Sequence, residues 1–290
     1  MNEPDHARHQ RMLAAYGFGL FPTPAYREGA AGQWRLVRHL PSLAEGYASG
    51  AGFERNRHVL YRGRTAWMST GIMEQESHAF HLHRARGVVV VAGLGLAMFV
   101  HAAALKPEVD RVVVIEIDAE VIDLMREASG WEAWQGREKI IILEADARDP
   151  EVAPHVLDAS GGRPCDYLFA DIWPVCADPA APGETAEMVG ALRPRAAGWW
   201  GQELSFARWW RGRGETATAE EGLQAALVEY FAEVGVPVPL TPGYVAFCRD
   251  VMTANGLLAA PPAAAGSLLR RTWRAGGKGM QQRRAGHRSR

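Results

Sequence analysis

Residues 88–97 read Val-Val-Val-Val-Ala-Gly-Leu-Gly-Leu-Ala, and this stretch decides the fold class of the 290-residue chain. Four consecutive β-branched residues predict a strand that is buried on both faces. Gly93 and Gly95 allow a tight turn after the strand, because glycine adopts backbone conformations that other residues avoid. The alanine-rich segment that follows predicts the start of a helix. A buried strand, a glycine turn and a helix N-terminus form a unit that is typical of nucleotide-like cofactor binding.

Strand-like and helix-like segments alternate from residue 87 to residue 171. Runs of β-formers predict parallel strands over 88–91, 112–117, 140–143 and 167–170, with a fifth over 198–203. Helices are expected over 98–105 and 119–128. Asp118 stands at the N-cap of the second helix, and Gly130 lies just beyond its end. The expected fold class is therefore α/β, a Rossmann-like, doubly wound and mostly parallel sheet.

Smaller elements flank this sheet on both sides. Before it, two β-rich runs meet at Arg62-Gly63-Arg64 in a small N-terminal β-hairpin region, and a short helix is expected over 73–85. After it, apolar residues at helical spacing predict C-terminal helices over 218–234 and from Tyr244 to Asn255. The predicted division is an N-terminal extension (1–86), a cofactor-binding Rossmann-like domain (87–210), a helical C-terminal region (211–260) and a basic, disordered tail (261–290).

An acidic residue follows each of the next three predicted strands. Glu116 comes 23 residues after Gly93, where an acid accepts hydrogen bonds from two ribose hydroxyls. Asp146 is expected to accept a hydrogen bond from an adenine amino group, while the backbone N–H of Ala147 donates to the ring. Asp171 follows the fourth strand, at the carboxyl edge of the sheet, where ligands of α/β proteins bind. Four consecutive strands that end in a glycine turn or an acid indicate a nucleoside-bearing cofactor.

A nicotinamide dinucleotide is the alternative cofactor for such a turn. Its fingerprint, G-x-G-x-x-G, has a third glycine that lets the helix pack closely against the strand. Met98 occupies that third position here. A dinucleotide also leaves Asp146 and Asp171 without a task, so an oxidoreductase is not favoured.

Together these segments resemble the class I S-adenosylmethionine-dependent methyltransferase fold. The resemblance covers about residues 87–205, and its matching pieces are Val-Val-Ala-Gly-Leu-Gly-Leu-Ala at 90–97, Val-Ile-Glu-Ile-Asp at 114–118, Glu-Ala-Asp-Ala-Arg at 144–148 and Phe-Ala-Asp-Ile-Trp-Pro at 169–174. It implies that Gly93 and Gly95 line the methionine part of the cofactor. It also implies that Glu116 binds the ribose and Asp146 the adenine. Asp171 would face the methionine amine and the substrate, as the catalytic orienting group or base.

Within that fold the chain is most similar to the spermidine synthase branch, the polyamine aminopropyltransferases. Val91 stands two residues before the first glycine, as is common in that branch, and the segment before the turn places Glu74 and His78 in part of its acidic-Tyr-His-Glu signature. Ser77 and Ala79 replace the tyrosine and glutamate of that signature. The likeness therefore concerns architecture, and transfer to a polyamine is not predicted. It still implies decarboxylated S-adenosylmethionine as an alternative cofactor.

Four further residues are candidates for contact with the substrate: Glu74, His78, Trp173 and Glu203. Glu74, His78 and His81 share a helical face at spacings that also fit metal ligands. The resemblance places this segment at the substrate-gating loop of the family, so the cluster either contacts the substrate or consists of plain structural histidines, and no metal is predicted. Glu203 is expected at the end of the fifth strand, at the same edge as Asp171.

Composition limits the class of protein further. The chain is 48% hydrophobic and 22% charged, it has no apolar run of membrane-spanning length, and its N-terminus lacks a signal pattern, so a cytoplasmic protein is expected. Three cysteines cannot pair completely and are predicted to be reduced. Residues 267–290 hold eight Lys and Arg and no acid. This segment is either a solvated end or a contact site for nucleic acid or an acidic partner.

The leading hypothesis is an S-adenosylmethionine-dependent methyltransferase that acts on a small-molecule acceptor of unknown identity. An aminopropyltransferase-like enzyme on a non-standard amine is one alternative, and a cofactor-binding regulatory or scaffold protein without catalysis is another. A homodimer is the assembly to be tested.

Overall fold

The computed structural model describes residues 3–213 and 220–258, and its centre is a five-stranded parallel sheet. The strand order across this sheet is β11-β10-β7-β8-β9. The bounds are β7 (Gly87–Ala92), β8 (Val109–Glu116), β9 (Ile140–Glu144), β10 (Tyr167–Ala170) and β11 (Ala196–Trp199). The register places Val90 of β7 between Val113 of β8 and Leu168 of β10. The predicted Rossmann-like α/β fold is confirmed.

Both faces of the sheet are buried, as the continuous β-branched run of β7 predicts. Val90 and Ala92 belong to one core cluster, and Val89 and Val91 belong to the other. On the second face lie α3 (Met98–Ala104) and α4 (Ala119–Ala128), and α4 begins at its N-cap Asp118 as predicted. On the first face lie α5 (Val152–Ala159) and α6 (Ala181–Leu192). Short 3-10 turns, η1 (Trp131–Ala133) and η2 (Arg137–Lys139), connect α4 to β9.

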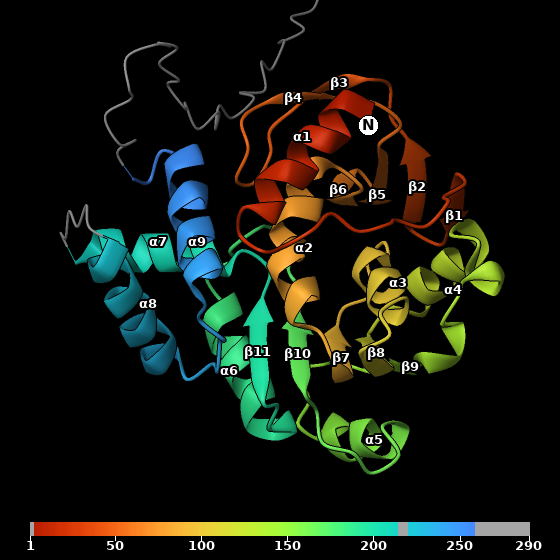
Figure 1. The fold of residues 1–290 in the computed structure, drawn as a ribbon. Coiled ribbons are helices and arrows are strands. Elements are labelled where there is room, and N and C mark those ends of the chain that lie inside the picture. The colour runs from red at the N-terminus through yellow and green to blue at the C-terminus, as the bar shows by residue number, and fades with distance from the viewer. Residues whose placement is uncertain (1–2, 214–219, 259–290) are drawn as a thin grey trace, which may run out of the picture. The chain divides into compact units, whose positions relative to one another are not determined.

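The N-terminal region is larger than a hairpin. The predicted hairpin is present as β5 (His58–Arg62) and β6 (Thr65–Ser69), and it lies within a four-stranded antiparallel sheet with β1 (Gly29–Ala31) and β2 (Trp34–Arg38). A separate two-stranded ribbon pairs β3 (Ser42–Ala44) with β4 (Gly52–Glu54). Helix α1 (Glu3–Ala14) precedes these strands, and α2 (Ile72–Arg84) links them to β7. In Figure 1 the arrowheads of β10 and β11 point towards this N-terminal region.

The C-terminal helices are α7 (Gln202–Gly212), α8 (Glu220–Val234) and α9 (Pro242–Ala254), and they cover the edge of the sheet beside β11. The fifth strand was predicted too far along the chain. It ends at Trp199, and Gly201, with φ of 83°, turns the chain into α7. Glycine adopts this left-handed conformation without strain, so Gly201 can end the strand direction at this point. Gln202 and Glu203 therefore belong to helix α7 and not to the strand.

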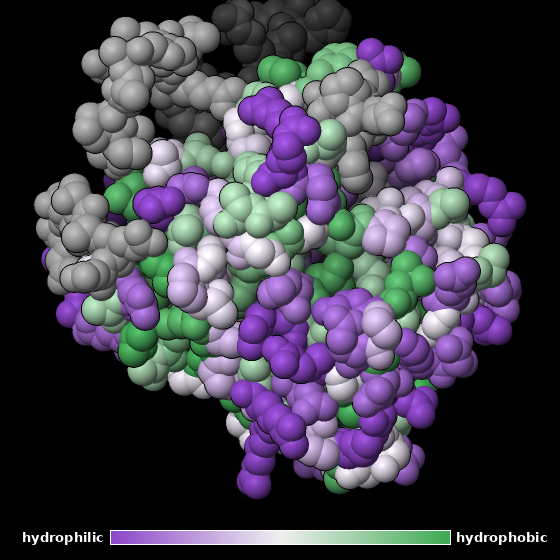
Figure 2. Space-filling model, viewed as in Figure 1, coloured by the Kyte–Doolittle hydropathy of each residue, from purple (hydrophilic) through white to green (hydrophobic). Residues whose placement is uncertain are grey.

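The described residues belong to one compact unit, and the predicted division into regions stays a prediction. The boundary at 86 falls between α2 and β7, and the boundary at 210 falls inside α7. The predicted basic tail lies outside the described residues. No helix within residues 3–213 and 220–258 is long and apolar enough to cross a membrane. Figure 2 shows hydrophilic and hydrophobic side chains intermingled on the described part of one face, which is the usual surface of a globular protein.

Candidate functional site

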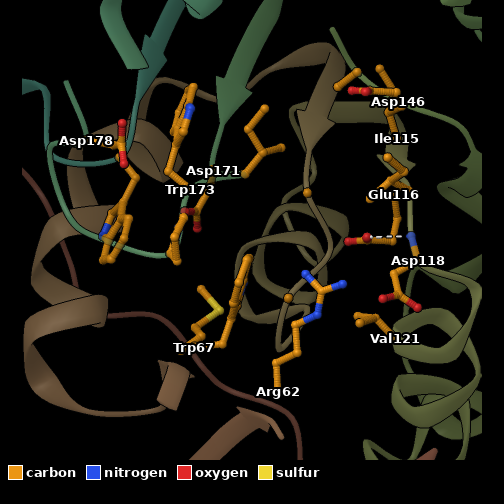
Figure 3. Close-up of a pocket in the computed structure, with 18 of the residues that line it drawn as sticks. Arg62, Trp67, Ile115, Glu116, Asp118, Val121, Asp146, Asp171, Trp173 and Asp178 are labelled. Atoms are coloured by element: carbon orange, nitrogen blue, oxygen red, sulfur yellow. Dashed lines mark hydrogen bonds between the residues drawn. The ribbon is translucent and has the colours of Figure 1, made fainter. Parts of the chain in front are cut away.

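A cavity of about 470 Å³ lies at the carboxyl ends of the parallel strands. Its floor comes from the segments that follow β7, β8, β9 and β10, and its roof comes from β2, β5 and β6 of the N-terminal sheet. The strand order reverses between β7 and β10, and α/β proteins bind ligands at such a switch point. Figure 3 shows the floor acids and the roof side chains directed into one space.

The glycine turn after β7 lines the cavity and also contacts other parts of the protein. Gly93 has φ of 94°, and a Cβ at this position would lie 2.2 Å from the carbonyl oxygen of Asp171. Gly95 has φ of 50°, and its Cβ would lie 2.6 Å from Sδ of Met68 in the roof. Gly93 is therefore required by the fold itself, whether or not a cofactor approaches it, whereas a Cβ at Gly95 would meet only the flexible side chain of Met68.

Glu116, at the end of β8, ties the glycine turn to the next strand. Its Oε2 accepts a hydrogen bond of 2.8 Å from the backbone N–H of Leu94, and its Oε1 accepts one of 2.9 Å from the N–H of Asp118. Burial raises the pKa of this carboxyl, while the two backbone hydrogen bonds lower it. A carboxylate has about four lone-pair sites, so each oxygen retains one for a hydroxyl donor.

Asp146 and Ala147 form the end of the cavity beyond β9. The carboxylate of Asp146 accepts hydrogen bonds of 3.0 and 2.9 Å from the Arg148 guanidinium, and this pairing lowers its pKa. Ala147 lines the cavity, and its backbone N–H donates to no atom of the described residues. Ile117 is 61% exposed although it is a large apolar residue at the cavity wall. The free N–H of Ala147 could donate a hydrogen bond to the edge of a planar heterocycle, and the exposed side chain of Ile117 could pack against its face.

Asp171 lines the cavity from the turn after β10, opposite Glu116 in Figure 3. Glu74, from the first turn of α2, lines the same space and is buried. Its Oε1 accepts a weak hydrogen bond of 3.4 Å from Ser69 N–H, and its Oε2 is buried without a partner. Burial and then the charge of Asp171 raise the pKa of Glu74 well above its usual value. The site thus holds two neighbouring carboxyls, Glu74 and Asp171.

His78 was predicted to contact the substrate, but it does not line the cavity. It lies behind Asp171, with Nε2 at 3.3 Å from Oδ2 of that residue and without hydrogen-bond alignment. The imidazole is completely buried and has Phe169 and Phe99 in edge contact. This geometry fits a residue that orients Asp171.

The other two substrate candidates lie in different places. Trp173 lines the cavity, and its indole N–H donates to Glu184 at 2.8 Å. Glu203 is not among the lining residues. It is fully buried on α7, where Tyr47 donates a hydrogen bond of 2.8 Å to its Oε2. Burial raises the pKa of Glu203 to about 7, against the lowering effect of the Tyr47 hydrogen bond.

A metal site finds no support within the described residues, where no group of three or more suitable ligands is present. His81 instead places Nδ1 at 2.9 Å from the hydroxyl of Tyr167. The three cysteines are free thiols, as predicted.

The roof of the cavity was missed by sequence reasoning. It consists of Trp34, Leu60, Arg62, Trp67 and Met68. Leu60 and Arg62 stand two residues apart on β5 and so share one face of the strand, and this period of two was the available signal. Trp67 and Met68 both face the cavity although they are consecutive, because the β5–β6 register skips Trp67 in a β-bulge.

The fold and the site together define a Rossmann-like α/β protein with an acidic cavity at its switch point.

No protein-family model and no curated protein matches the chain. Among solved structures it is similar to a spermidine synthase in complex with the transition-state analogue AdoDATO, with 13% identity over 59% of this chain and 54% of that chain and a TM-score of 0.33. It is also similar to spermidine synthase from Thermotoga maritima, with 14% identity over 59% and 55% of the two chains and a TM-score of 0.34. A third similar structure is the aminoglycoside resistance methyltransferase NpmB1, with 19% identity over 45% and 59% of the two chains and a TM-score of 0.25. The chain spans about half the length of the first two.

Proposed function

We propose that this protein is an S-adenosylmethionine-dependent transferase, and specifically a methyltransferase that acts on a small molecule. The observation that supports this proposal most strongly is the placement of Glu116, Asp146 and Asp171. Each lies at or just beyond the carboxyl end of a different parallel strand, and all three line one cavity together with the glycine turn.

The residues present fit a nucleoside sulfonium cofactor. The cavity volume of about 470 Å³ lies within the range of small-molecule sites. Glu116 would hold the ribose hydroxyls with its remaining lone pairs, and Asp146 with the free N–H of Ala147 would hold the adenine. Gly93, Gly95 and Asp171 would surround the methionine part. Acids outnumber bases among the lining residues, which favours a cationic ligand.

When bound, the cofactor supplies a methyl group activated by its sulfonium. The chain then has to orient an acceptor and take up its proton. Asp171 is placed for this task, since its carboxylate faces the cavity and the buried imidazole of His78 lies behind it. Burial, and then the neighbouring Asp171, raise the pKa of Glu74, which favours its protonated form.

Aminopropyl transfer from decarboxylated S-adenosylmethionine is the second candidate. The observation that favours it is the buried Glu74 beside Asp171, because two carboxyls at one point suit an amine of the acceptor. Catalysis by either route distinguishes the protein from a cofactor-binding scaffold.

Calorimetry with four ligands tests the proposal: S-adenosylmethionine, S-adenosylhomocysteine, 5′-methylthioadenosine and NAD. We expect S-adenosylmethionine and S-adenosylhomocysteine to bind and NAD not to bind. Binding of 5′-methylthioadenosine in strong preference to S-adenosylhomocysteine would support aminopropyl transfer instead. Absence of binding by all three adenosyl compounds would contradict the proposal.

A further inference from the structure

The charged residues that line the cavity are almost all engaged by other groups of the protein. Asp118 accepts from Trp34 Nε1 and from Glu120 N–H, and Asp178 accepts from the N–H of Ala180. Glu116, Asp146, Asp171 and Glu184 have the partners described above. Of the two lining cations, Arg148 is bound to Asp146. Glu74 has one oxygen without a partner, and the side chain of Arg62 has no hydrogen bond or ion pair to any described residue.

Arg62 is nevertheless held in place. Its guanidinium lies over the ring of Trp34, 5.5 Å from the centroid, and near that of Trp67, at 5.8 Å. Trp34 is its direct cross-strand partner on β2, and Trp67 is the bulged residue of β6. A guanidinium that lies over two indole rings is restrained by cation–π attraction, which leaves its N–H donors unused.

The position of Arg62 relates it to the glycine turn. It shares the roof with Met68, whose Sδ accepts a hydrogen bond of 3.3 Å from the Leu96 N–H directly after Gly95. In Figure 3 the guanidinium points into the space between Trp67 and the side of the cavity that carries Glu116 and Asp118, with Asp171 across from it. The site therefore offers an anion at Asp171 and a cation at Arg62 on two sides of one turn.

We propose that Arg62 binds the α-carboxylate of the cofactor and so selects S-adenosylmethionine over its decarboxylated form. This inference rests on the proposed function. A guanidinium donates two parallel hydrogen bonds to a carboxylate, whereas the acidic floor would repel one. Arg62 takes the carboxylate, which is the group that distinguishes the amino-acid end of S-adenosylmethionine from the amine of its decarboxylated form. The cavity thereby favours the methyl donor over the aminopropyl donor.

The test compares two ligands that differ in this group. S-adenosylhomocysteine carries the amino-acid end, and 5′-methylthioadenosine lacks it. Calorimetry is performed with the wild type, Arg62→Met, Arg62→Lys and the control Arg64→Met. Arg64 is exposed on the same hairpin and does not line the cavity. Thermal unfolding of each variant verifies that the roof is intact.

We expect Arg62→Met to weaken S-adenosylhomocysteine by about 10- to 100-fold, the usual effect of losing a charge-assisted pair, and to leave 5′-methylthioadenosine within twofold. Arg62→Lys should lose less affinity for S-adenosylhomocysteine than Arg62→Met, and Arg64→Met should bind both ligands as the wild type does. An unchanged affinity for S-adenosylhomocysteine in Arg62→Met, or an equal loss for both ligands, overturns the inference alone. Failure of both ligands to bind the wild type overturns the proposed function and this inference with it.

Discussion

Glu203 gives this protein a pH-dependent stability that can be isolated with one substitution. Its side chain is fully buried on α7, and Tyr47 donates to it. Burial raises its pKa from 4.5 to about 7 in the folded protein. The folded state therefore binds this proton more tightly than the unfolded chain does. The resulting stability is present below pH 4.5 and is lost as the pH rises through about 7.

The magnitude follows from these two values. Between pH 5 and pH 8 the contribution of Glu203 to the free energy of unfolding should fall by about 2.5 kcal/mol. Glu203→Gln removes the ionisation and keeps an oxygen that accepts from Tyr47. Other buried acids also titrate, so the informative quantity is the difference between variant and wild type. Relative to the wild type, the free energy of unfolding of Glu203→Gln should rise by about 2.5 kcal/mol between pH 5 and pH 8.

Urea unfolding at pH 5, 6, 7 and 8, followed by tryptophan fluorescence, measures this difference. Glu187→Gln is the matched control, because Glu187 is exposed on α6 and its replacement should give the same pH profile as the wild type. A constant difference between Glu203→Gln and the wild type from pH 5 to pH 8 would refute the argument, since Glu203 would then not change its charge in this interval.

Two further predictions concern the candidate site. Asp171→Asn should lower turnover by about 10²- to 10⁴-fold, as expected for a lost general base, and change S-adenosylhomocysteine affinity only a few-fold; unchanged turnover would exclude that role. Gly93→Ala should destabilise the protein by about 1–3 kcal/mol, because its φ of 94° and the carbonyl oxygen of Asp171 leave no room for a Cβ. Gly190→Ala in α6 is its control, with open space around the new Cβ, and should be neutral or stabilising by up to about 1 kcal/mol. Equal thermal stability of the two alanine variants would contradict this reasoning.

The sequence predicted the sheet and its edge because parallel strands bring their carboxyl ends together. Glu116, Asp146 and Asp171 lie far apart in the chain, yet each follows a strand of the same sheet, and one cavity receives all three. Helix α4 was predicted with its correct bounds, since Asp118 and Gly130 mark its ends with capping chemistry.

The predictions were weaker where tertiary packing decides the position of a side chain. Glu203 was assigned to the edge of the sheet because the apolar run before it reads as one continuous strand. Gly201 redirects the chain after Trp199. Glu203 then lies in the first turn of α7, and its side chain is fully buried. The spacing of His78 fits a residue that contacts the substrate, but most residues of its helix are buried. The imidazole therefore lies against Asp171 on the side away from the cavity.

The roof of the cavity could not be deduced from the linear pattern. Strands β1, β3 and β4 are three residues long, too short for a recognisable alternation. The inward position of Trp67 depends on a bulge, which is a property of the pairing between two strands. The sequence therefore indicated only that Arg62 belongs to a turn, although Arg62 lines the cavity.

The most direct test of the proposed function is the affinity for S-adenosylhomocysteine of Glu116→Gln compared with Glu144→Gln. The two glutamates are paired across β8 and β9, but only Glu116 lines the cavity. We predict that Glu116→Gln weakens binding by about 10- to 100-fold, because the ribose loses charged acceptors, and that Glu144→Gln binds as the wild type does. Equal binding by both variants, each shown to be folded, would contradict the assignment of this cavity to the cofactor.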